Sequence, residues 1–406
     1  MIRRVAFISL HSCPLQQPGQ GNAGGMNVYL RELGVAMAGS GVDVVAFTRR
    51  SDRPTPEVVE VVPGYRVVHI DAGPPTTMPI RDMYGLVGDF AESTLAWIDR
   101  SGEQFDVIHS HYWLSGWAGV LLKEKLNLPL ANSFHTLGRV KDLTRRTDQR
   151  ASGIIRTMTE EEVIARSDCV VASTPFEFDD LIQHYSADPE RLCTSPPGIR
   201  HDVFQPGSRE AARVWTGLDG SPTVLFAGRI QPLKGLDIAI EALAMLHTPK
   251  ARLIVIGGPS GRDGEAELRR LAELACGLGI ADRITFIPPL ARNQLVEFYQ
   301  AADVVIVPSR SESFGLVAAE AQSTGTPVVA ANIGGLSFII EDGKSGLLVE
   351  GYEPGAYATA IDRVLSDPEF AERLSAGAVQ HSQRFSWETT VDRLLELYEG
   401  IAANPR

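Results

Sequence analysis

Short apolar segments alternate with longer amphipathic segments along the whole chain. The apolar segments are rich in valine and isoleucine and contain few polar residues, which is typical of strands buried on both faces. Alternation of such strands with helices predicts βα units and parallel sheets. In the first half the predicted strands begin at Val5, Val42, Tyr65, Phe105 and Asp168, and the first helix covers residues 26–38.

The same pattern restarts after a turn-rich segment, S-P-P-G-I-R-H-D-V-F-Q-P-G, at residues 195–207. Its predicted strands begin at Thr223, Ala251, Arg283, Asp303 and Pro327, and its helices cover residues 236–246, 265–278 and 293–301. A chain of 406 residues is too long for one ordinary core and suits two domains of about 200 residues each. We therefore expect an α/β protein with two doubly wound domains, residues 1–195 and 196–385. Because ligands bind beyond the carboxyl ends of such strands, the two sets of loops should face each other across a cleft.

Composition narrows the class of protein. Hydrophobic residues make up 44% of the chain and charged residues 22%, and no apolar segment is long enough to cross a bilayer. The N-terminus carries no charged and apolar leader, so we expect a cytoplasmic protein. The four cysteines lack C-x-x-C spacing, which predicts reduced thiols that form neither a disulfide framework nor a zinc site.

The formal net charge is −12. A field of this sign repels nucleic acid and anionic lipid, so an anionic small molecule needs a local basic cluster. The loop G-R-I-Q-P-L-K-G supplies one, with Arg229 and Lys234 on either side of a proline-stiffened turn. Two solvated surface cations are the ordinary alternative. The position of the loop, directly after a predicted strand, favours an anion site.

The segment P-S-R-S-E-S-F-G-L-V-A-A-E, at residues 308–320, carries two carboxylates across a predicted helix start. Gly315 would lie in the first turn, where unpaired N–H groups attract an anion. Taken alone, the segment could be only a buried strand followed by a capped helix. Beside Arg229 and Lys234, it predicts a diphosphate site where Glu312 and Glu320 accept hydrogen bonds from sugar hydroxyls.

A long glycine-rich loop follows the first strand, at residues 11–29. Gly24 and Gly25 directly precede a helix, so bare backbone could approach a phosphate closely. The loop lacks G-x-G-x-x-G after a short turn, which argues against a nicotinamide dinucleotide. Its length and polar residues favour a ligand loop over a flexible connection. These polar residues are His11, Gln17, Asn22 and Asn27.

Further polar residues follow apolar runs in the first half, within H-S-H-Y-W-L-S-G-W and S-F-H-T-L. His111, Tyr112, His135 and Thr136 could hydrogen-bond a polyhydroxylated ligand, and a basic segment extends through Arg156. Combined with the diphosphate site, these residues predict a nucleotide sugar as co-substrate. No D-x-D motif ends a predicted strand, so we expect no metal; cations and backbone N–H groups would stabilise the leaving charge.

At these motifs the chain resembles, over nearly its whole length, the retaining glycosyltransferases of GT-B fold that share a Glu-x7-Glu pair, the family 4 type. Within that family it is most similar to the mycothiol-pathway transferases, which move N-acetylglucosamine from UDP to inositol phosphate. The matching runs are Q-Q-P-G-Q-G-N-A-G-G-M-N-V-Y, H-S-H-Y-W-L-S-G, H-T-L, R-I-Q-P-L-K-G, G-G-P-S-G and E-S-F-G-L-V-A-A-E-A-Q.

The resemblance implies a role for each matching residue. The donor-binding residues would be Gln17, Gly24, Gly25, Arg229, Lys234, Glu312, Phe314, Gly315, Leu316 and Glu320. The acceptor-binding residues would be His11, Asn22, Asn27, Arg81, Tyr112, Thr136 and Arg156. The catalytic residues would be His135, Arg229, Lys234 and Glu312. The resemblance further implies same-face attack in which the leaving phosphate helps to deprotonate the acceptor, no cofactor, a homodimer, and a final helix in residues 386–406 that crosses back to the first domain.

Two positions differ from the mycothiol enzymes. Where those enzymes carry a lysine for the acceptor's phosphate, this chain has Ile80 or, with a one-residue shift, Arg81; Asn22 replaces an aspartate. The acceptor therefore stays open. The nucleobase stays open as well, since neither Glu312 nor Glu320 distinguishes uracil from guanine or adenine. An unphosphorylated polyol is possible, and transfer to fructose 6-phosphate, as in sucrose-phosphate synthases, is the nearest rival. A nucleotide-sugar-binding module without turnover is less favoured because every expected catalytic group is present, and a dinucleotide oxidoreductase ranks last.

Overall fold

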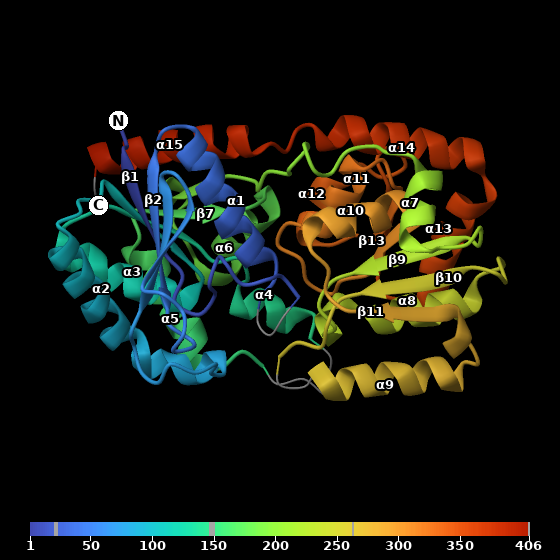
Figure 1. The fold of residues 1–406 in the computed structure, drawn as a ribbon, viewed down its shortest axis with the longest axis horizontal. Helices are drawn as coiled ribbons and strands as arrows, with labels where there is room; N and C mark the ends of the chain where they lie inside the picture. The colour runs from blue at the N-terminus through green and yellow to red at the C-terminus, as the bar shows by residue number, and fades with distance from the viewer. Residues whose placement is uncertain (20–22, 146–150, 262–263, 405–406) are drawn as a thin grey trace.

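The computed structural model describes residues 1–19, 23–145, 151–261 and 264–404. They form two Rossmann-like α/β domains, each built on one sheet flanked by helices (Figure 1). The first sheet has eight strands in the order β3-β4-β2-β1-β5-β6-β7-β8, and the second has six in the order β11-β10-β9-β12-β13-β14. Every neighbouring pair is parallel except β3 with β4. The predicted fold class is confirmed.

The first domain contains the strands β1 (Arg4–Ile8), β2 (Asp43–Arg49), β3 (Val58–Val62), β4 (Tyr65–Ile70), β5 (Val107–His111), β6 (Leu130–Ser133), β7 (Cys169–Ala172) and β8 (Leu192–Thr194). Its helices are α1 (Gly25–Gly39), η1 (Ile80–Leu86), α2 (Val87–Ser101), α3 (Trp113–Leu126), α4 (Gly138–Leu143), α5 (Ile154–Arg166), α6 (Pro175–Tyr185) and η2 (Pro189–Arg191). All five predicted strands and the predicted helix are present, with bounds shifted by at most two residues.

The second domain contains the strands β9 (Thr223–Ala227), β10 (Arg252–Ile256), β11 (Ile284–Ile287), β12 (Val304–Val307), β13 (Val328–Ala331) and β14 (Leu347–Val349). Its helices are α7 (Arg209–Thr216), η3 (Pro232–Lys234), α8 (Leu236–Met245), α9 (Gly264–Gly277), η4 (Ala281–Arg283), α10 (Arg292–Ala301), α11 (Leu316–Ser323), α12 (Gly334–Ile339), α13 (Pro354–Ser366) and α14 (Pro368–Ser382). The strands and helices predicted here are confirmed.

Four strands were not predicted. β6 lies inside the first sheet, between β5 and β7, but it is only four residues long, and two of these, Asn132 and Ser133, are polar. The other three, β3, β8 and β14, lie at sheet edges. β3 has two exposed and three partly exposed residues, and it pairs antiparallel with β4, so it lacks the continuous apolar pattern of a central strand. β8 and β14 are only three residues long. Short or half-exposed edge strands carry too little hydrophobic pattern to be recognised.

The final helix, α15 (Trp387–Ala403), packs on α1 in the core of the first domain (Figure 1). Its Tyr398 hydroxyl lies 2.5 Å from His109 Nδ1, and its Thr390 hydroxyl donates to the Pro196 carbonyl at 2.8 Å. The first sheet ends with β8 at Thr194, and the next strand, β9, belongs to the second sheet. Together with the contacts of α15, this supports the domain bounds 1–195, 196–385 and 386–406, which we keep as a proposal.

The prediction that all cysteines are reduced is wrong. A disulfide joins Cys169 of β7 to Cys193 of β8. These strands are neighbours in the sheet, with Val171 paired to Cys193, so two cysteines 24 residues apart in sequence come together. Strand order is a tertiary property that cysteine spacing does not contain. Among the described residues, no helix is long and apolar enough to cross a membrane.

Candidate active site

Two neighbouring strands of the second sheet bring Lys234 and Glu312 together. β9 and β12 pair in parallel, so the loops that follow them leave the same edge of the sheet. Lys234 Nζ donates to Glu312 Oε2 at 2.6 Å, and both side chains are largely but not fully buried. The predicted basic loop and the predicted carboxylate segment therefore form one unit.

Arg310, which the sequence did not single out, fixes the two loops together. Its backbone N–H donates to the Leu233 carbonyl at 2.8 Å, and its guanidinium donates to the Pro232 carbonyl and to both carboxylate oxygens of Asp237. Gly235, at φ 69°, follows Lys234, and a Cβ there would lie 2.0 Å from the Pro308 carbonyl oxygen. Only glycine permits so close an approach.

The glycine-rich loop of the first domain contacts this unit directly. A Cβ built on Gly24 would lie 3.0 Å from Arg229 Nε, and one built on Gly25 would lie 3.4 Å from Leu316 Cδ1. Gly24 and Gly315 are the N-cap residues of α1 and α11. The N-termini of two helices, one from each domain, therefore meet beside a guanidinium, and all three features attract an anion.

Arg229 makes no hydrogen bond or ion pair with the residues that the structure describes. Burial lowers the pKa of its guanidinium, and the charge of Glu312 partly offsets this effect. A cation held in a low-dielectric site without a partner gains from a bound anion. Gln17 also reaches the second domain, where its Nε2 donates to the Pro289 carbonyl at 3.4 Å.

Glu320 lies on α11 and is 6% exposed. Arg292 Nη2 donates to one of its oxygens at 2.9 Å and the Tyr299 hydroxyl to the other at 3.2 Å. Burial raises its pKa, and Arg292 opposes that shift. Each oxygen keeps a lone pair that a ligand hydroxyl could use. Phe314, by contrast, is buried against Phe385, so only its backbone is available to a donor.

Four predicted acceptor residues form one cluster in the first domain. The rings of His11 and Tyr112 lie 4.4 Å apart, and the Arg156 guanidinium lies over the Tyr112 ring at 5.2 Å. Arg156 Nη2 donates to the Thr136 carbonyl at 2.8 Å and to its hydroxyl at 3.2 Å. His11 Nδ1 is buried and has no hydrogen-bond partner in the described part of the chain. The cluster thus offers a cation and unused polar atoms.

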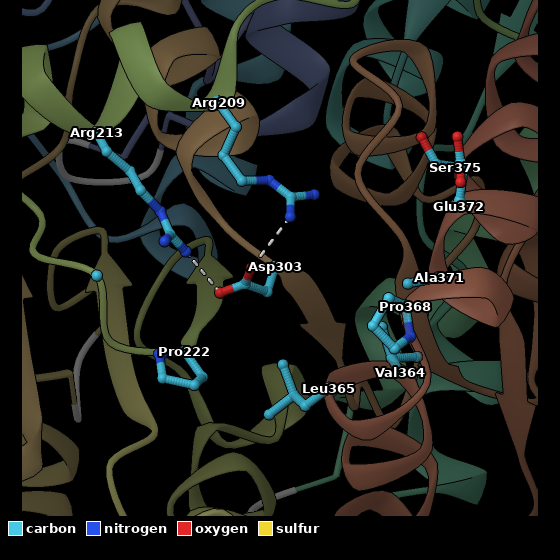
Figure 2. Close-up of a pocket in the computed structure, with 11 residues that line it drawn as sticks. Arg209, Arg213, Pro222, Asp303, Val364, Leu365, Pro368, Ala371, Glu372 and Ser375 are labelled. Carbon is cyan, nitrogen blue, oxygen red and sulfur yellow. Dashed lines mark hydrogen bonds and ion pairs between the residues drawn. The ribbon is translucent and has the colours of Figure 1, made fainter.

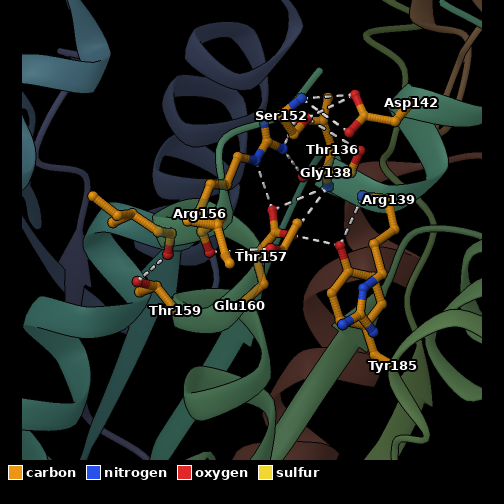
Figure 3. A network of polar contacts seen from close by, with 12 residues as sticks. Thr136, Gly138, Arg139, Asp142, Ser152, Arg156, Thr157, Thr159, Glu160 and Tyr185 are labelled. Carbon is orange, nitrogen blue, oxygen red and sulfur yellow. Dashed lines mark hydrogen bonds and ion pairs between the residues drawn. The ribbon is translucent and has the colours of Figure 1, made fainter.

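Glu160 on α5 orients Arg156 (Figure 3). This fully buried carboxylate accepts from Arg156 Nε at 2.8 Å, from the Gly138 backbone N–H at 3.1 Å and from the Tyr185 hydroxyl. One glutamate therefore connects α4, α5 and α6. This buried hydrogen-bond network keeps the guanidinium of Arg156 in one orientation.

His135 joins the two halves of the site. It follows β6 at φ 60°, and its carbonyl accepts from the Ser313 hydroxyl of the second domain at 2.6 Å. Its Nε2 lies 3.1 Å from His111 Nδ1. Burial lowers the pKa of His135 to about 4 and that of His11 to about 3. Both imidazoles are therefore neutral at pH 7.

Two predicted acceptor residues lie outside this cluster, and a third is not among the described residues. Asn27 is buried, and it accepts from Ser12 and Gly24 and donates to the Cys13 carbonyl, so it holds the glycine-rich loop rather than presenting a free amide. The side chain of Arg81 is 64% exposed and pairs with Asp82, with no contact to the acceptor cluster among the described residues. Asn22 lies outside the described residues.

Lys141 was missed. It lies on α4 three residues after Gly138, on the same helix face, and a Cβ on Gly138 would lie 3.2 Å from Arg156 Nε. Burial, together with the charges of Arg156 and Arg229, lowers the pKa of Lys141. Its amino group has no partner among the described residues. The one feature of the sequence that could have indicated Lys141 as an acceptor-site residue is its position four residues after the H-T-L motif.

A cavity of about 360 Å³ lies elsewhere in the second domain (Figure 2). It opens at the amino ends of β9 and β12, opposite the loops described above, since Pro222 and Asp303 line it. Asp303 already pairs with Arg209 and Arg213. The described residues contain no group of side chains that could hold a metal ion.

Two family models match the chain. The model described as glycosyl transferases group 1 matches residues 208–381, and the model described as a glycosyl transferase 4-like domain matches residues 24–198. The chain is 45% identical over 408 residues to a D-inositol 3-phosphate glycosyltransferase of Geodermatophilus obscurus, covering 98% of this chain and 90% of that protein. It is 45% identical over 404 residues to the one of Xylanimonas cellulosilytica, covering 97% and 96%.

Solved structures have the same fold. A sucrose-phosphate synthase from Thermosynechococcus elongatus superposes with a TM-score of 0.92 at 33% identity, covering 99% of both chains. HepE from Anabaena, solved with UDP and glucose, superposes with a TM-score of 0.78 at 19% identity, covering 98% of this chain and 100% of that one. At this lower identity the likeness speaks for the fold alone.

Proposed function

This chain belongs to the group 1 glycosyl transferases, and we propose that it transfers N-acetylglucosamine or a related hexose from a UDP-linked donor to inositol phosphate or a similar small polyol. The relatives named D-inositol 3-phosphate glycosyltransferase support this acceptor. The family excludes an oxidoreductase and makes the chain an enzyme rather than a binding module. The cytoplasmic location and the homodimer remain predictions.

The observation that carries the proposal is the contact of Arg229 with Gly24. It places a guanidinium without an ionic partner against the N-terminus of a helix from the other domain, with Lys234 in the same loop as Arg229. A diphosphate bound there would replace water as the partner of these groups. The same groups would stabilise the negative charge that develops as the sugar leaves.

The proposed reaction is a same-face displacement, as the resemblance implies. The bond from the anomeric carbon to the diphosphate oxygen breaks, a bond from that carbon to the acceptor oxygen forms, and the proton of the acceptor hydroxyl passes to the departing phosphate. His135 would lie near the reacting carbon. Because its pKa is lowered to about 4, the ring would contact the sugar without a positive charge.

The acceptor would lie against His11, Tyr112, Thr136 and Arg156. A phosphate on the acceptor suits Arg156, whose planar fork binds phosphate oxygens, and the free amino group of Lys141. Lys141 would then supply, from another element, the cation that Ile80 cannot provide. We therefore favour a phosphorylated acceptor over an unphosphorylated one.

The test is a crossed screen of UDP-N-acetylglucosamine and UDP-glucose against inositol phosphate and inositol, with detection of released UDP. We expect release with inositol phosphate and a new glycoside in the product. The absence of both would refute the proposed acceptor. Fructose 6-phosphate belongs in the same screen because the sucrose-phosphate synthase structure matches with a TM-score of 0.92, which makes a hexose phosphate the second candidate acceptor.

A further inference from the structure

A buried carboxylate on α1 has no place in the mechanism above. Glu32 is 6% exposed, and its ion-pair partners among the described residues, Arg200 and Arg292, both lie outside the first-domain sheet and its helices. Its Oε1 accepts from Arg292 Nη1 at 3.2 Å, and its Oε2 accepts from Arg200 Nη1 at 3.1 Å. Arg292 begins α10, whereas Arg200 lies in the segment that joins the two sheets. Glu32 therefore ties α1 to the connection and to the second domain at once.

The guanidinium of Arg292 is shared between the domains. While Nη1 donates to Glu32, Nη2 donates to Glu320 of α11 at 2.9 Å. The guanidinium lies over the fully buried ring of Phe204 at 4.9 Å, which limits its movement. One planar group thus fixes two carboxylates, one from each domain, in a single arrangement.

The two carboxylates belong to elements that meet the donor at different points. α1 begins at Gly25, seven residues before Glu32, so its N-terminus lies roughly 10 Å from this pair along a rigid helix. That N-terminus is the proposed diphosphate site, and Glu320 is one of the proposed donor-binding residues. A shift of α1 relative to the second domain would break the pair of Glu32 with Arg292 and release one hydrogen bond that orients Arg292 against Glu320.

We propose that Glu32 is a positioning residue that couples donor binding to the relative placement of the two domains. The proposal rests on the donor site given under the proposed function. Without the Glu32 carboxylate, Arg292 keeps Glu320 as its one carboxylate partner among the described residues, and α1 loses its ion pair with the second domain. Part of the binding free energy of the nucleotide is then used to bring the two domains into the binding arrangement, so its measured affinity falls.

The test is Glu32→Gln, which keeps the shape of the side chain and removes its charge. Binding of UDP, ADP and GDP is measured by calorimetry, so that whichever diphosphate binds the unmodified protein serves as the probe. We expect its affinity to fall about tenfold, within the usual range of coupling between sites. The donor KM should rise similarly while the acceptor KM stays unchanged. Glu92→Gln, an exposed glutamate on α2, is the matched control and should change neither.

Circular dichroism and thermal unfolding without ligand establish that the variants fold. Glu32→Asp, which keeps the charge on a shorter side chain, provides a second measurement and should weaken the nucleotide less than Glu32→Gln. Equal nucleotide affinity in Glu32→Gln and the unmodified protein would overturn the coupling. So would an equal rise of both KM values, because a general loss of structure affects both substrates. Failure of transfer to inositol phosphate, with nucleotide binding still sensitive to Glu32→Gln, would refute the proposed acceptor and leave the coupling supported.

Discussion

The donor half and the acceptor half of the candidate site are built differently. In the donor half, Arg229, Lys234 and Glu312 come from two loops that follow neighbouring strands, and Arg310 ties these loops together. The acceptor half draws His11, Tyr112, Thr136 and Arg156 from four separate segments. A buried polar network on Glu160 holds α4, α5 and α6 in place, and Arg156 of this network contacts Thr136 and Tyr112.

We interpret the donor half as the part that serves the transfer step itself, and the acceptor half as the part that determines which acceptor binds. In the proposed function the charges of the donor half act on one leaving group, and the geometry of this half depends on the strand pairing of a single sheet. The acceptor half depends on loops and short helices, which can change without disturbing a sheet. Substitutions should therefore act on the rate in the donor half and on acceptor affinity in the acceptor half.

The largest effect is expected for Lys234→Ala. The amino group would stabilise the leaving diphosphate, so we expect the turnover rate to fall at least about a hundredfold, or ~2.7 kcal/mol of transition-state stabilisation. The rate of UDP release at saturating acceptor measures it. Lys250→Ala, at an exposed position of the same domain, should leave the rate unchanged. A normal rate in Lys234→Ala would remove this lysine from the mechanism.

The donor half could be predicted from the sequence because its groups are contiguous motifs. G-R-I-Q-P-L-K-G and the segment 308–320 each follow an apolar strand, and parallel strands place such loops at one edge. What the sequence lacked was strand order. The pairing of β9 with β12 brings Lys234 to Glu312, just as the pairing of β7 with β8 brings Cys169 to Cys193.

The acceptor half was predicted less completely because its parts carry no common spacing. Lys141 has no motif of its own and became visible only through its position on α4. Arg81 was predicted to bind the acceptor because a one-residue shift aligns it with a lysine of the enzymes that the chain resembles. In the structure its side chain is exposed and pairs with Asp82. Asn27 supports the glycine-rich loop through hydrogen bonds that depend on the folded backbone. Tertiary contacts, which a linear pattern does not contain, decide each of these roles.

The second prediction contrasts Arg156→Ala with Arg81→Ala. Loss of a charged hydrogen-bond donor from the acceptor cluster should raise the acceptor KM roughly thirtyfold, ~2 kcal/mol, and leave the donor KM unchanged. Arg81→Ala should change the acceptor KM less than about twofold, because surface ion pairs contribute little. Steady-state kinetics with inositol phosphate measure both. The reverse ranking would move the acceptor site to η1.

The third prediction concerns acid stability. Burial lowers the pKa of five first-domain histidines: to about 3 for His11 and His109, to about 4 for His135, well below 6.5 for His111, and below 6.5 for His69. Below pH 6.5 the unfolded chain binds protons that the native chain does not. Stability should therefore fall as the pH decreases from 6.5 towards 4, by up to about 1.4 kcal/mol per pH unit for each histidine.

Unfolding temperatures measured from pH 7.5 to pH 4.5 test this prediction, and amide hydrogen exchange locates the loss. Amides of β5 and β6 should lose protection before those of β9 and β12, because five of the six histidines with a lowered pKa lie in the first domain. His247→Gln is the control, since that side chain is 95% exposed and should not change the profile. Earlier loss in the second sheet would contradict the assignment of acid sensitivity to the acceptor half.

The smallest effect, and the one that discriminates best between acceptors, is expected for Lys141→Ala. If its amino group binds the acceptor's phosphate, the KM for inositol phosphate should rise about fivefold, ~1 kcal/mol, whereas the KM for inositol should not change. Lys125→Ala, exposed in the last turn of α3, is the matched control. Equal rises for both acceptors would show that Lys141 contacts no phosphate. A rise confined to the phosphorylated acceptor would show that this chain recognises the phosphate from α4.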